Sequence, residues 1–207
     1  MSDKGERTKE RITRAGADLF HRKGFAATSV SDLLKAAGVK KGSLYFHFPG
    51  KEDLAIEVLQ QAEIEFMDFL DSALVGPTPA ARLENFFRKA FEIHSRRGFA
   101  GGCLFGNTAL EASDSNPRYA SRVARVFGRW NEKIEAVVIE AQAAGQIRTD
   151  LTGGALAQLV VSSIEGGIML SRLHKEAEPL SSCLDSLRTL LELNPEKENE
   201  HATNRSA

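Results

Sequence analysis

The sequence predicts an all-α protein of about nine helices, in which three short helices come first and about six longer helices follow. Almost every segment with regular spacing places apolar residues at the three- and four-residue intervals of an amphipathic helix. No convincing alternation of strand type appears, and no repeat recurs at a fixed period. The 207 residues are 42% hydrophobic and 27% charged, which is the composition of an ordinary globular protein.

The first three helices are short and each has a local start or stop signal. The first carries an apolar stripe over residues 12–20 and ends at Gly24. Ser29 to Asp32 has the form of a capping box, which predicts a second helix that Gly38 ends. A third helix is expected over residues 41–46, after a tight turn.

Prolines and acidic residues mark the longer helices. Glu52 and Asp53 favour a helix start after Pro49-Gly50, and this helix is expected to reach about Leu74. Thr78-Pro79 and Asn116-Pro117 each place a capping side chain before a proline at the first helical position.

The C-terminal half of the chain adds three more helical segments. A glycine-rich loop over residues 98–106 leads into a short helix near residues 107–112. Apolar stripes over residues 156–170 and 184–191 predict the last two helices. From Pro195 onward the sequence is polar, and we expect a disordered tail.

Charge is distributed unevenly along the chain. Residues 1–51 hold 11 Lys and Arg against 5 Asp and Glu, whereas residues 52–207 hold 16 against 23. A basic head on an acidic body predicts that the head meets a polyanion, although a chance excess on a solvated surface is the alternative. Charge and polarity therefore divide the chain into a basic head over residues 1–51, an acidic body over 52–194 and a polar tail over 195–207.

Several classes of protein are excluded by what the sequence lacks. The sequence has no run of about 18 apolar residues, so we expect no membrane span. Its first residues are charged, which is not typical of a secretory signal. Cys103 and Cys183 cannot form a disulfide framework, which favours a reduced, cytoplasmic protein. No zinc-protease motif, nucleophile elbow or phosphate-binding glycine loop is present, so we expect no metal, no cofactor and no catalysis.

Residues 29–46 have the spacing of a helix-turn-helix, with Gly38 in the turn. The N-terminus of its second helix combines exposed N–H groups with lysine charges, which suits an anionic groove. Gly42 would permit close approach to a base or phosphate, or would merely relieve crowding. Tyr45 could hydrogen-bond phosphate or be buried. The apolar side chains expected to pack beneath this helix are Leu44, Phe46 and Phe48.

The stretch from Thr28 to Leu54, with Gly-Ser-Leu-Tyr-Phe-His-Phe at its centre, resembles the DNA-binding signature of the TetR family of bacterial transcriptional regulators. The match extends upstream through residues 17–25 and covers nearly all of residues 7–54. The resemblance implies a three-helix DNA-binding domain, here residues 1–51, on a larger helical ligand-binding and dimerisation domain, here residues 52–194. It also implies a homodimer that binds double-stranded operator DNA until a small-molecule effector releases it.

The resemblance also implies functional positions in the head. Lys40 departs from the small polar residue of many relatives, and its charge favours a phosphate contact over base recognition. The implied phosphate contacts are Thr28, Tyr45, His47 and Lys51. The implied recognition-helix contacts are Lys40, Lys41, Gly42 and Ser43.

The body is rich in aromatic residues, which predicts an apolar pocket between helices or, alternatively, plain core packing. Cys103 could be a thiolate sensor of electrophiles, favoured by a helix N-terminus, or a small apolar filler. The candidate pocket residues are Phe66, Phe69, Phe91, His94, Cys103, Phe105, Asn107, Trp130 and Glu165.

The last two helices are expected to form a two-fold four-helix dimer interface, because small residues beside large apolar ones permit close helix crossing. The alternative is that this stripe packs within one chain. The candidate interface residues are Leu156, Val160, Ser163, Gly167, Leu170, Leu184, Leu187 and Leu191.

These observations predict a DNA-binding transcriptional regulator, a dimeric repressor released from its operator by a small, largely apolar or aromatic ligand. Within this class, the alternative is an electrophile or redox sensor acting through Cys103. From another class, the alternative is a ligand-binding or enzymatic helical protein with a decayed DNA-binding head.

Overall fold

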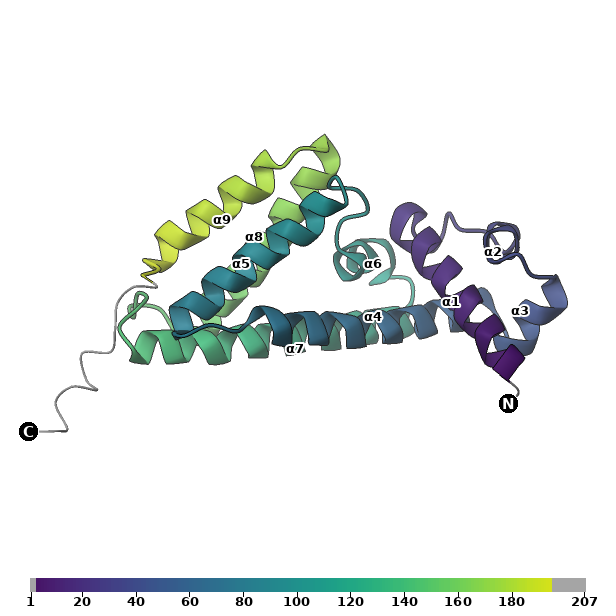
Figure 1. The fold of residues 1–207 in the computed structure, drawn as a ribbon, viewed down its shortest axis with the longest axis horizontal. Coiled ribbons are helices and arrows are strands. Elements are labelled where there is room, and N and C mark those ends of the chain that lie inside the picture. Colours follow the sequence, from purple (N-terminus) through teal and green to yellow (C-terminus); the bar gives the residue numbers. More distant parts are fainter. Residues whose placement is uncertain (1–2, 195–207) are drawn as a thin grey trace, which may run out of the picture. The chain divides into compact units, whose positions relative to one another are not determined.

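The computed structural model describes residues 3–194, and in that range the chain forms nine α-helices and no strand (Figure 1). This confirms the predicted all-α class, but the prediction that the first three helices are short is wrong for the first one, which has 21 residues. The helices are α1 (Asp3–Lys23), α2 (Val30–Ala37), α3 (Lys41–His47), α4 (Lys51–Ala73), α5 (Pro79–Arg96), α6 (Leu104–Ala112), α7 (Pro117–Ala143), α8 (Gly153–His174) and α9 (Glu178–Leu191).

The chain divides into two compact units. The first comprises the chain up to Phe66 together with Gly101–Val126, and the second comprises Met67–Ala100 together with the chain from Phe127 onward. Helices α4 and α7 each begin in the first unit and end in the second. The predicted functional boundary after residue 51 stays a prediction, and the predicted tail over 195–207 lies outside the described residues.

Local sequence signals fix the ends of the short helices. The Ser29 hydroxyl accepts from the Asp32 N–H at 3.1 Å, and the Asp32 carboxylate accepts from the Ser29 N–H at 3.1 Å, so the predicted capping box starts α2. These bonds hold the pKa of Asp32 below its usual range. Gly38 ends α2 in the left-handed region at φ 60°, where glycine has no steric penalty.

The longer helices also begin at their predicted caps. Thr78 accepts from the Ala81 N–H before Pro79, and Asn116 accepts from the N–H groups of Arg118 and Tyr119. Helix α6 begins at Leu104 rather than near Asn107, because the loop before it closes on the sulfur of Cys103, which accepts from the Gly106 N–H at 3.4 Å.

The core of the first unit lies where α1, α2 and α3 meet. Phe20, Leu33 and Leu44 are at most 1% exposed there. Within this unit, α4 is tied to α7 by Glu63, a buried carboxylate that accepts from Arg122 and Arg125 at 3.0 Å each. Burial of one carboxylate between two guanidinium groups makes its removal more costly than loss of a surface pair.

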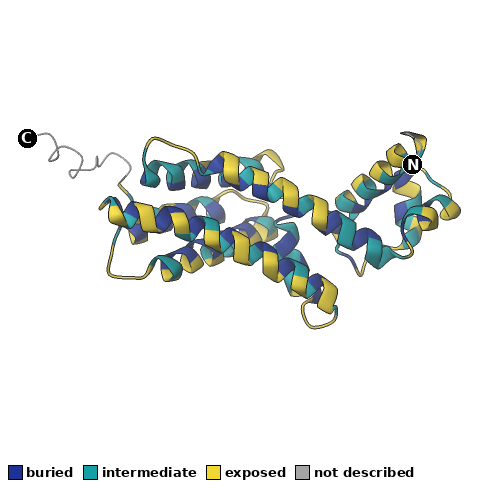
Figure 2. Ribbon diagram, turned by 90° about the horizontal axis from the view of Figure 1, so that it is seen from below, coloured by how far each residue is buried: buried dark blue, intermediate teal, exposed yellow. Residues whose placement is uncertain are grey.

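The second unit is built around α5, α8 and α9, which lie beside one another (Figure 1). Each helix turns a buried face inward and an exposed face outward (Figure 2). Arg188 of α9 donates to both oxygens of Glu84 on α5, at 2.8 and 2.6 Å. The bidentate geometry fixes the register of the two helices.

Helix α8 is strongly apolar. It is the one helix among residues 3–194 whose length and composition would let it cross a membrane, with a mean hydropathy of 1.3. The sequence analysis expected no such segment. One face of α8 packs on α9, with Leu180 donating its N–H to the buried Ser171 hydroxyl at 2.9 Å. Burial of that face accounts for part of the apolar composition, and exposed Leu159, Met169, Leu170 and Leu173 contribute the rest.

Candidate nucleic-acid interface

A tight turn joins α2 to α3 and places lysines at the start of α3. Lys40 precedes the helix in an extended conformation and Lys41 is its first residue. Both side chains are exposed, and so is Gly42. At Gly42 an added Cβ would meet no atom within 4 Å, so within the chain glycine is not needed to relieve crowding.

The exposed face of α3 combines cationic and aromatic groups. Tyr45 is 42% exposed, and the Lys41 ammonium lies 5.8 Å from the centre of its ring. Ser43 and His47 are half-buried on the same helix. The predicted DNA contacts on α3 therefore share one short, accessible element, and the proposed burial of Tyr45 does not occur.

An open groove of about 360 Å³ lies between α3 and the first turns of α1. It brings Lys4 of α1 beside the predicted recognition residues, a neighbourhood that the sequence did not predict. The run of basic residues in α1 was the signal that could have indicated it. The groove is lined by Lys4, Gly5, Thr8, Gly42, Ser43, Phe46 and His47.

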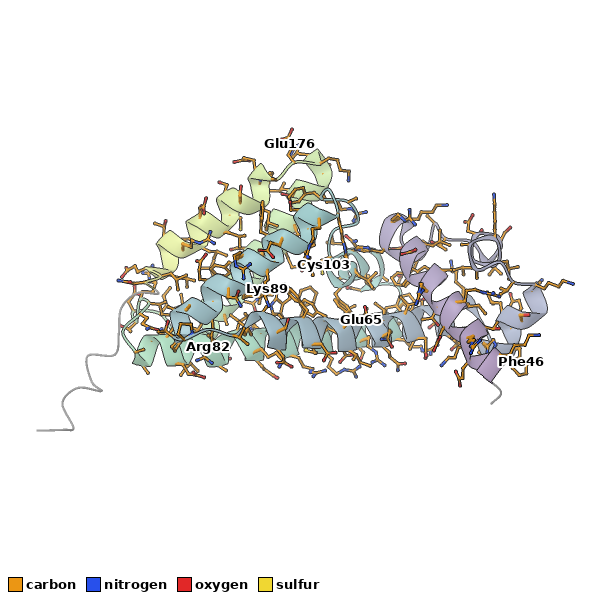
Figure 3. All side chains as sticks on the ribbon, in the orientation of Figure 1. Phe46, Glu65, Arg82, Lys89, Cys103 and Glu176 are labelled. Atoms are coloured by element: carbon orange, nitrogen blue, oxygen red, sulfur yellow. The ribbon has the colours of Figure 1, made fainter. Side chains whose placement is uncertain are left out.

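Phe46 corrects one expectation. Leu44 and Phe48 are buried as predicted, but Phe46 is 78% exposed and projects from α3 (Figure 3). Residues 44 and 48 are one helical turn apart, whereas residue 46 lies on the opposite side. Helical periodicity was the signal that should have separated Phe46 from its neighbours.

Thr28 and Lys51 meet at the loop before α2. Thr28 is fully buried, and its hydroxyl donates to the Gly24 carbonyl at 2.7 Å. The Lys51 ammonium donates to the carbonyls of Phe25 and Thr28 at 2.7 and 3.0 Å. A lysine has three N–H donors, so these bonds leave one more for another acceptor.

The candidate effector residues fall into two groups, one in each unit. Phe66, Cys103, Phe105 and Asn107 belong to the first unit, where the rings of Phe66 and Phe105 are 5.7 Å apart. Cys103 is half-buried at the start of α6 (Figure 3). The members in the second unit are Phe69, Phe91, His94, Trp130 and Glu165.

The aromatic residues of the second unit form two clusters. Trp130, 3% exposed, lies 6.4 Å from Phe86 edge to face and 5.9 Å from Phe127 in a stacked arrangement. The ring centres of Phe69, on α4, and Phe86 are 6.4 Å apart. Separately, Phe91 and Phe99 pair at 5.9 Å. Phe86 and Phe127 were not among the candidate pocket residues.

Most of the predicted dimer residues face the core of their own chain. Ser163 is half-buried and Leu170 is exposed. The buried residues are Leu156, Val160, Gly167, Leu184, Leu187 and Leu191. The opposite face of α8 instead exposes a stripe at three- and four-residue spacing, which we call the α8 outer stripe. It consists of the exposed residues Leu159, Ser162, Met169, Leu170 and Leu173 together with the half-buried Gly166.

The all-α fold and the cationic α2–α3 turn define a helix-turn-helix protein. Comparison with known families agrees. The model described as "Bacterial regulatory proteins, tetR family" matches residues 12–58, and that described as "Tetracyclin repressor-like, C-terminal domain" matches residues 79–187. The chain belongs to the TetR family of transcriptional regulators.

Individual relatives are similar over most of their length. The HTH-type transcriptional repressor DhaR of Mycobacterium sp. (strain GP1) is 30% identical over 85% of this chain and 88% of its own. The transcriptional regulator AcuR of Cereibacter sphaeroides is 33% identical over 83% and 79%. A crystal structure of a TetR transcriptional regulator from Chloroflexus aurantiacus is 32% identical, with a TM-score of 0.85 over 93% of this chain and 98% of that one.

Proposed function

We propose that this protein is a cytoplasmic, non-catalytic repressor that binds double-stranded operator DNA as a homodimer and leaves it when a small effector binds. Residues 1–51 form its DNA-binding domain and residues 52–194 its effector and dimerisation domain. The observation that carries the proposal is the exposed face of α3, where Lys40, Lys41, Gly42 and Tyr45 are all accessible. A relative named as a repressor supports the direction of control.

The residues of α3 divide into two roles in this proposal. Lys41, Gly42 and Ser43 meet base edges in the major groove, where lysine suits guanine and glycine permits close approach. Lys40, Tyr45 and His47 hydrogen-bond phosphates, which positions the helix without selecting a sequence. Lys4 extends the cationic surface along the groove between α1 and α3.

Lys51 and Thr28 serve the same interface from the loop before α2. The bonds from Lys51 to the Phe25 and Thr28 carbonyls fix this loop, and the third donor of Lys51 can reach a phosphate. The hydroxyl of Thr28 already donates within the chain, so its contribution to a phosphate contact would come through the backbone it positions.

The dimer in this proposal uses the α8 outer stripe. Leu173, Met169 and Leu170 are 72%, 51% and 42% exposed, and small residues lie between the large ones. Such a stripe suits close crossing with the same helix of a second chain. A two-fold dimer presents two α3 helices to half-sites one helical turn apart, about 34–36 Å.

The effector in this proposal binds at the cluster of Phe69, Phe86, Phe127 and Trp130 in the second unit. Phe69 and Phe127 are half-buried, so aromatic surface remains for a ring-containing ligand. Phe69 belongs to α4, the helix that begins at Lys51. A ligand that displaces Phe69 acts on that helix, and a coupling free energy of about 3 kcal/mol shifts operator affinity more than a hundredfold.

A second candidate mechanism rests on Cys103. Its sulfur accepts the Gly106 N–H at the start of α6, and a thiolate is favoured at a helix N-terminus. Cys103 would then be the sensor of electrophiles such as quinones or aldehydes. In that case Cys103→Ser keeps DNA binding but loses release by electrophiles, while Cys183→Ser changes neither.

The DNA-binding proposal is tested with the DNA upstream of the gene that encodes this chain. Fluorescence anisotropy compares this fragment with random DNA of equal length at several salt concentrations. We expect preference for the upstream fragment and a loss of this preference in Lys41→Ala. Arg97→Ala, which removes an exposed charge in the second unit, serves as the control. Equal affinity of the wild type for both DNAs would contradict the proposal.

The effector proposal is tested through Trp130, the single tryptophan of the chain. A panel of phenols, aromatic acids and quinones is screened for release of operator DNA. We expect every active compound to change Trp130 fluorescence, and Phe86→Ala to weaken its effect. Release without a change at Trp130, and insensitive to Phe86→Ala, would place the effector site elsewhere.

A further inference from the structure

The loop between α1 and α2 is held by two charged side chains that are distant in the sequence. The carboxylate of Glu111, on α6, accepts from the backbone N–H groups of Phe25 and Ala26 at 3.0 and 2.6 Å. Lys51 donates to the carbonyls of Phe25 and Thr28. Two backbone donors of the loop are therefore bonded to an anion and two of its acceptors to a cation, in a region without regular secondary structure.

Glu111 fits closely against the backbone at the end of α1. A Cβ atom at Gly24 would lie 2.6 Å from the nearer carboxylate oxygen, and Gly24 has a φ of 82°. The positive φ favours glycine there, and a larger residue would displace the Glu111 carboxylate. The ring of Phe25 is also enclosed, 4.6 Å from Phe20 and 5.0 Å from Tyr119. Glu111 itself is exposed, and its carboxylate lies over the backbone of residues 24–26 while Phe25 is buried beneath.

Helix α6 contacts α1 a second time, through the loop that precedes it. Because a carbonyl can only accept, the His21 ring donates from Nε2 to the Gly102 carbonyl, at 2.8 Å. Gly101 has a φ of 81°, which favours glycine, and a Cβ there would lie 2.6 Å from the His21 ring and displace it. Asn107 donates to the Gly101 carbonyl at 2.7 Å and so holds this loop against α6.

The loop that Glu111 holds leads directly into the helix-turn-helix. It carries Thr28 and ends at Ser29, the cap of α2. A shift of α6 along α1 of the order of a hydrogen-bond length would break both bonds to Phe25 and Ala26. The loop before α2 would then lose its bonds to the Glu111 carboxylate and keep only its bonds to Lys51.

We propose that Glu111 is a positioning residue for operator binding, through which α6 controls the loop before α2. This inference rests on the proposed function. Because Cys103, Phe105 and Asn107 lie in or beside α6, any ligand or modification there would act on the DNA-binding helices through Glu111. The coupling needs no movement of α3 within the head, only release of residues 25–28.

The test replaces Glu111 by glutamine, which keeps the size of the side chain but can accept from only one of the two N–H groups. The matched control is Asp114→Asn, which removes the same charge from an exposed position three residues away. Anisotropy measures the affinity for the upstream DNA and for random DNA, and chemical denaturation measures stability.

We expect Glu111→Gln to weaken specific binding roughly tenfold, the loss of one charge-assisted hydrogen bond, and to leave binding to random DNA as in the control. Amide exchange at Phe25 and Ala26 should accelerate in the variant. In the wild type, exchange of these two amides should slow when the upstream DNA is added, a measurement that needs no variant.

A double-mutant cycle with Lys51→Met adds a readout that general destabilisation would not move. Because both side chains act on residues 25–28, their effects on specific binding should be strongly non-additive. Additive effects, wild-type affinity in Glu111→Gln, or an equal loss in Asp114→Asn would each overturn the role of Glu111 while leaving the proposed function intact. Lack of specific binding by the wild type would overturn both.

Discussion

Gly167 of α8 lies so close to α9 that a Cβ atom added to it would be 3.0 Å from the Leu180 side chain and 3.2 Å from the Cβ of Cys183. The same region holds the Cys183 thiol, which donates to the Ser163 carbonyl at 3.0 Å, and burial raises the pKa of this thiol. The glycine therefore sets the distance between two helices of one chain.

Gly167→Val should lower the free energy of unfolding by about 1–3 kcal/mol, because the added methyl groups overpack the α8–α9 contact. Chemical denaturation measures the change. Gly128→Val is the matched control, since Gly128 lies inside α7 and an added Cβ there meets no atom within 4 Å. Equal stability of the two variants would show that the close crossing is not required.

The outer stripe of α8 gives a prediction about assembly that is separate from stability. Leu173→Glu should give monomers that remain folded, because Leu173 is 72% exposed within the chain. Size-exclusion chromatography with light scattering measures the assembly, and circular dichroism the fold. Val75→Glu, at a similarly exposed position outside α8 and α9, should stay dimeric. A monomeric wild type at micromolar concentration would refute the dimer.

The sequence predicts where helices begin and end far better than it predicts which segment or chain covers an apolar helix face. Ser29, Gly38, Thr78 and Asn116 act on backbone groups within a few residues, so their helix ends could be predicted. The apolar stripe of α8 identifies a buried face, but periodicity does not say whether the same chain or another covers it.

In the candidate site, too, the sequence predicts residues that share one helix but not contacts between distant parts of the chain. Lysines and Tyr45 of α3 could be assigned from the motif, because one short helix presents them all. Glu111 and Phe25 are separated by 86 positions, and nothing in the spacing of either residue indicates their contact. The pocket candidates were chosen for their chemistry alone, so sequence could not predict that they divide between two units.

Stability at alkaline pH should depend on Tyr119. Burial, with a further contribution from the nearby Glu52 carboxylate, raises the pKa of Tyr119 from 10.0 to about 12. The unfolded chain loses this proton near pH 10 while the folded chain keeps it, so the free energy of unfolding falls between about pH 10 and pH 12. In Tyr119→Phe this part of the decline should disappear. An absorbance titration of the folded protein, compared with the variant, isolates the tyrosine; ionisation near pH 10 would contradict the assignment.

Lys41 and Lys51 should differ in how their loss affects DNA binding. Each removes one positive charge, so Lys41→Ala and Lys51→Ala should each reduce the salt dependence of binding by about one phosphate contact. Lys41→Ala should also change which sequences are preferred, because Lys41 is exposed at the start of α3 and touches no carbonyl of the loop. Lys51→Ala should instead lower the free energy of unfolding by about 1–3 kcal/mol, because the carbonyls of Phe25 and Thr28 lose a charged donor.

Affinity measured across salt concentrations and across a set of operator variants, together with denaturation of each protein, separates these effects. If Lys51→Ala were as stable as the wild type, the bonds from Lys51 to the loop would not contribute to the folded state; if Lys41→Ala kept the wild-type order of preference, base recognition would have to lie elsewhere on α3.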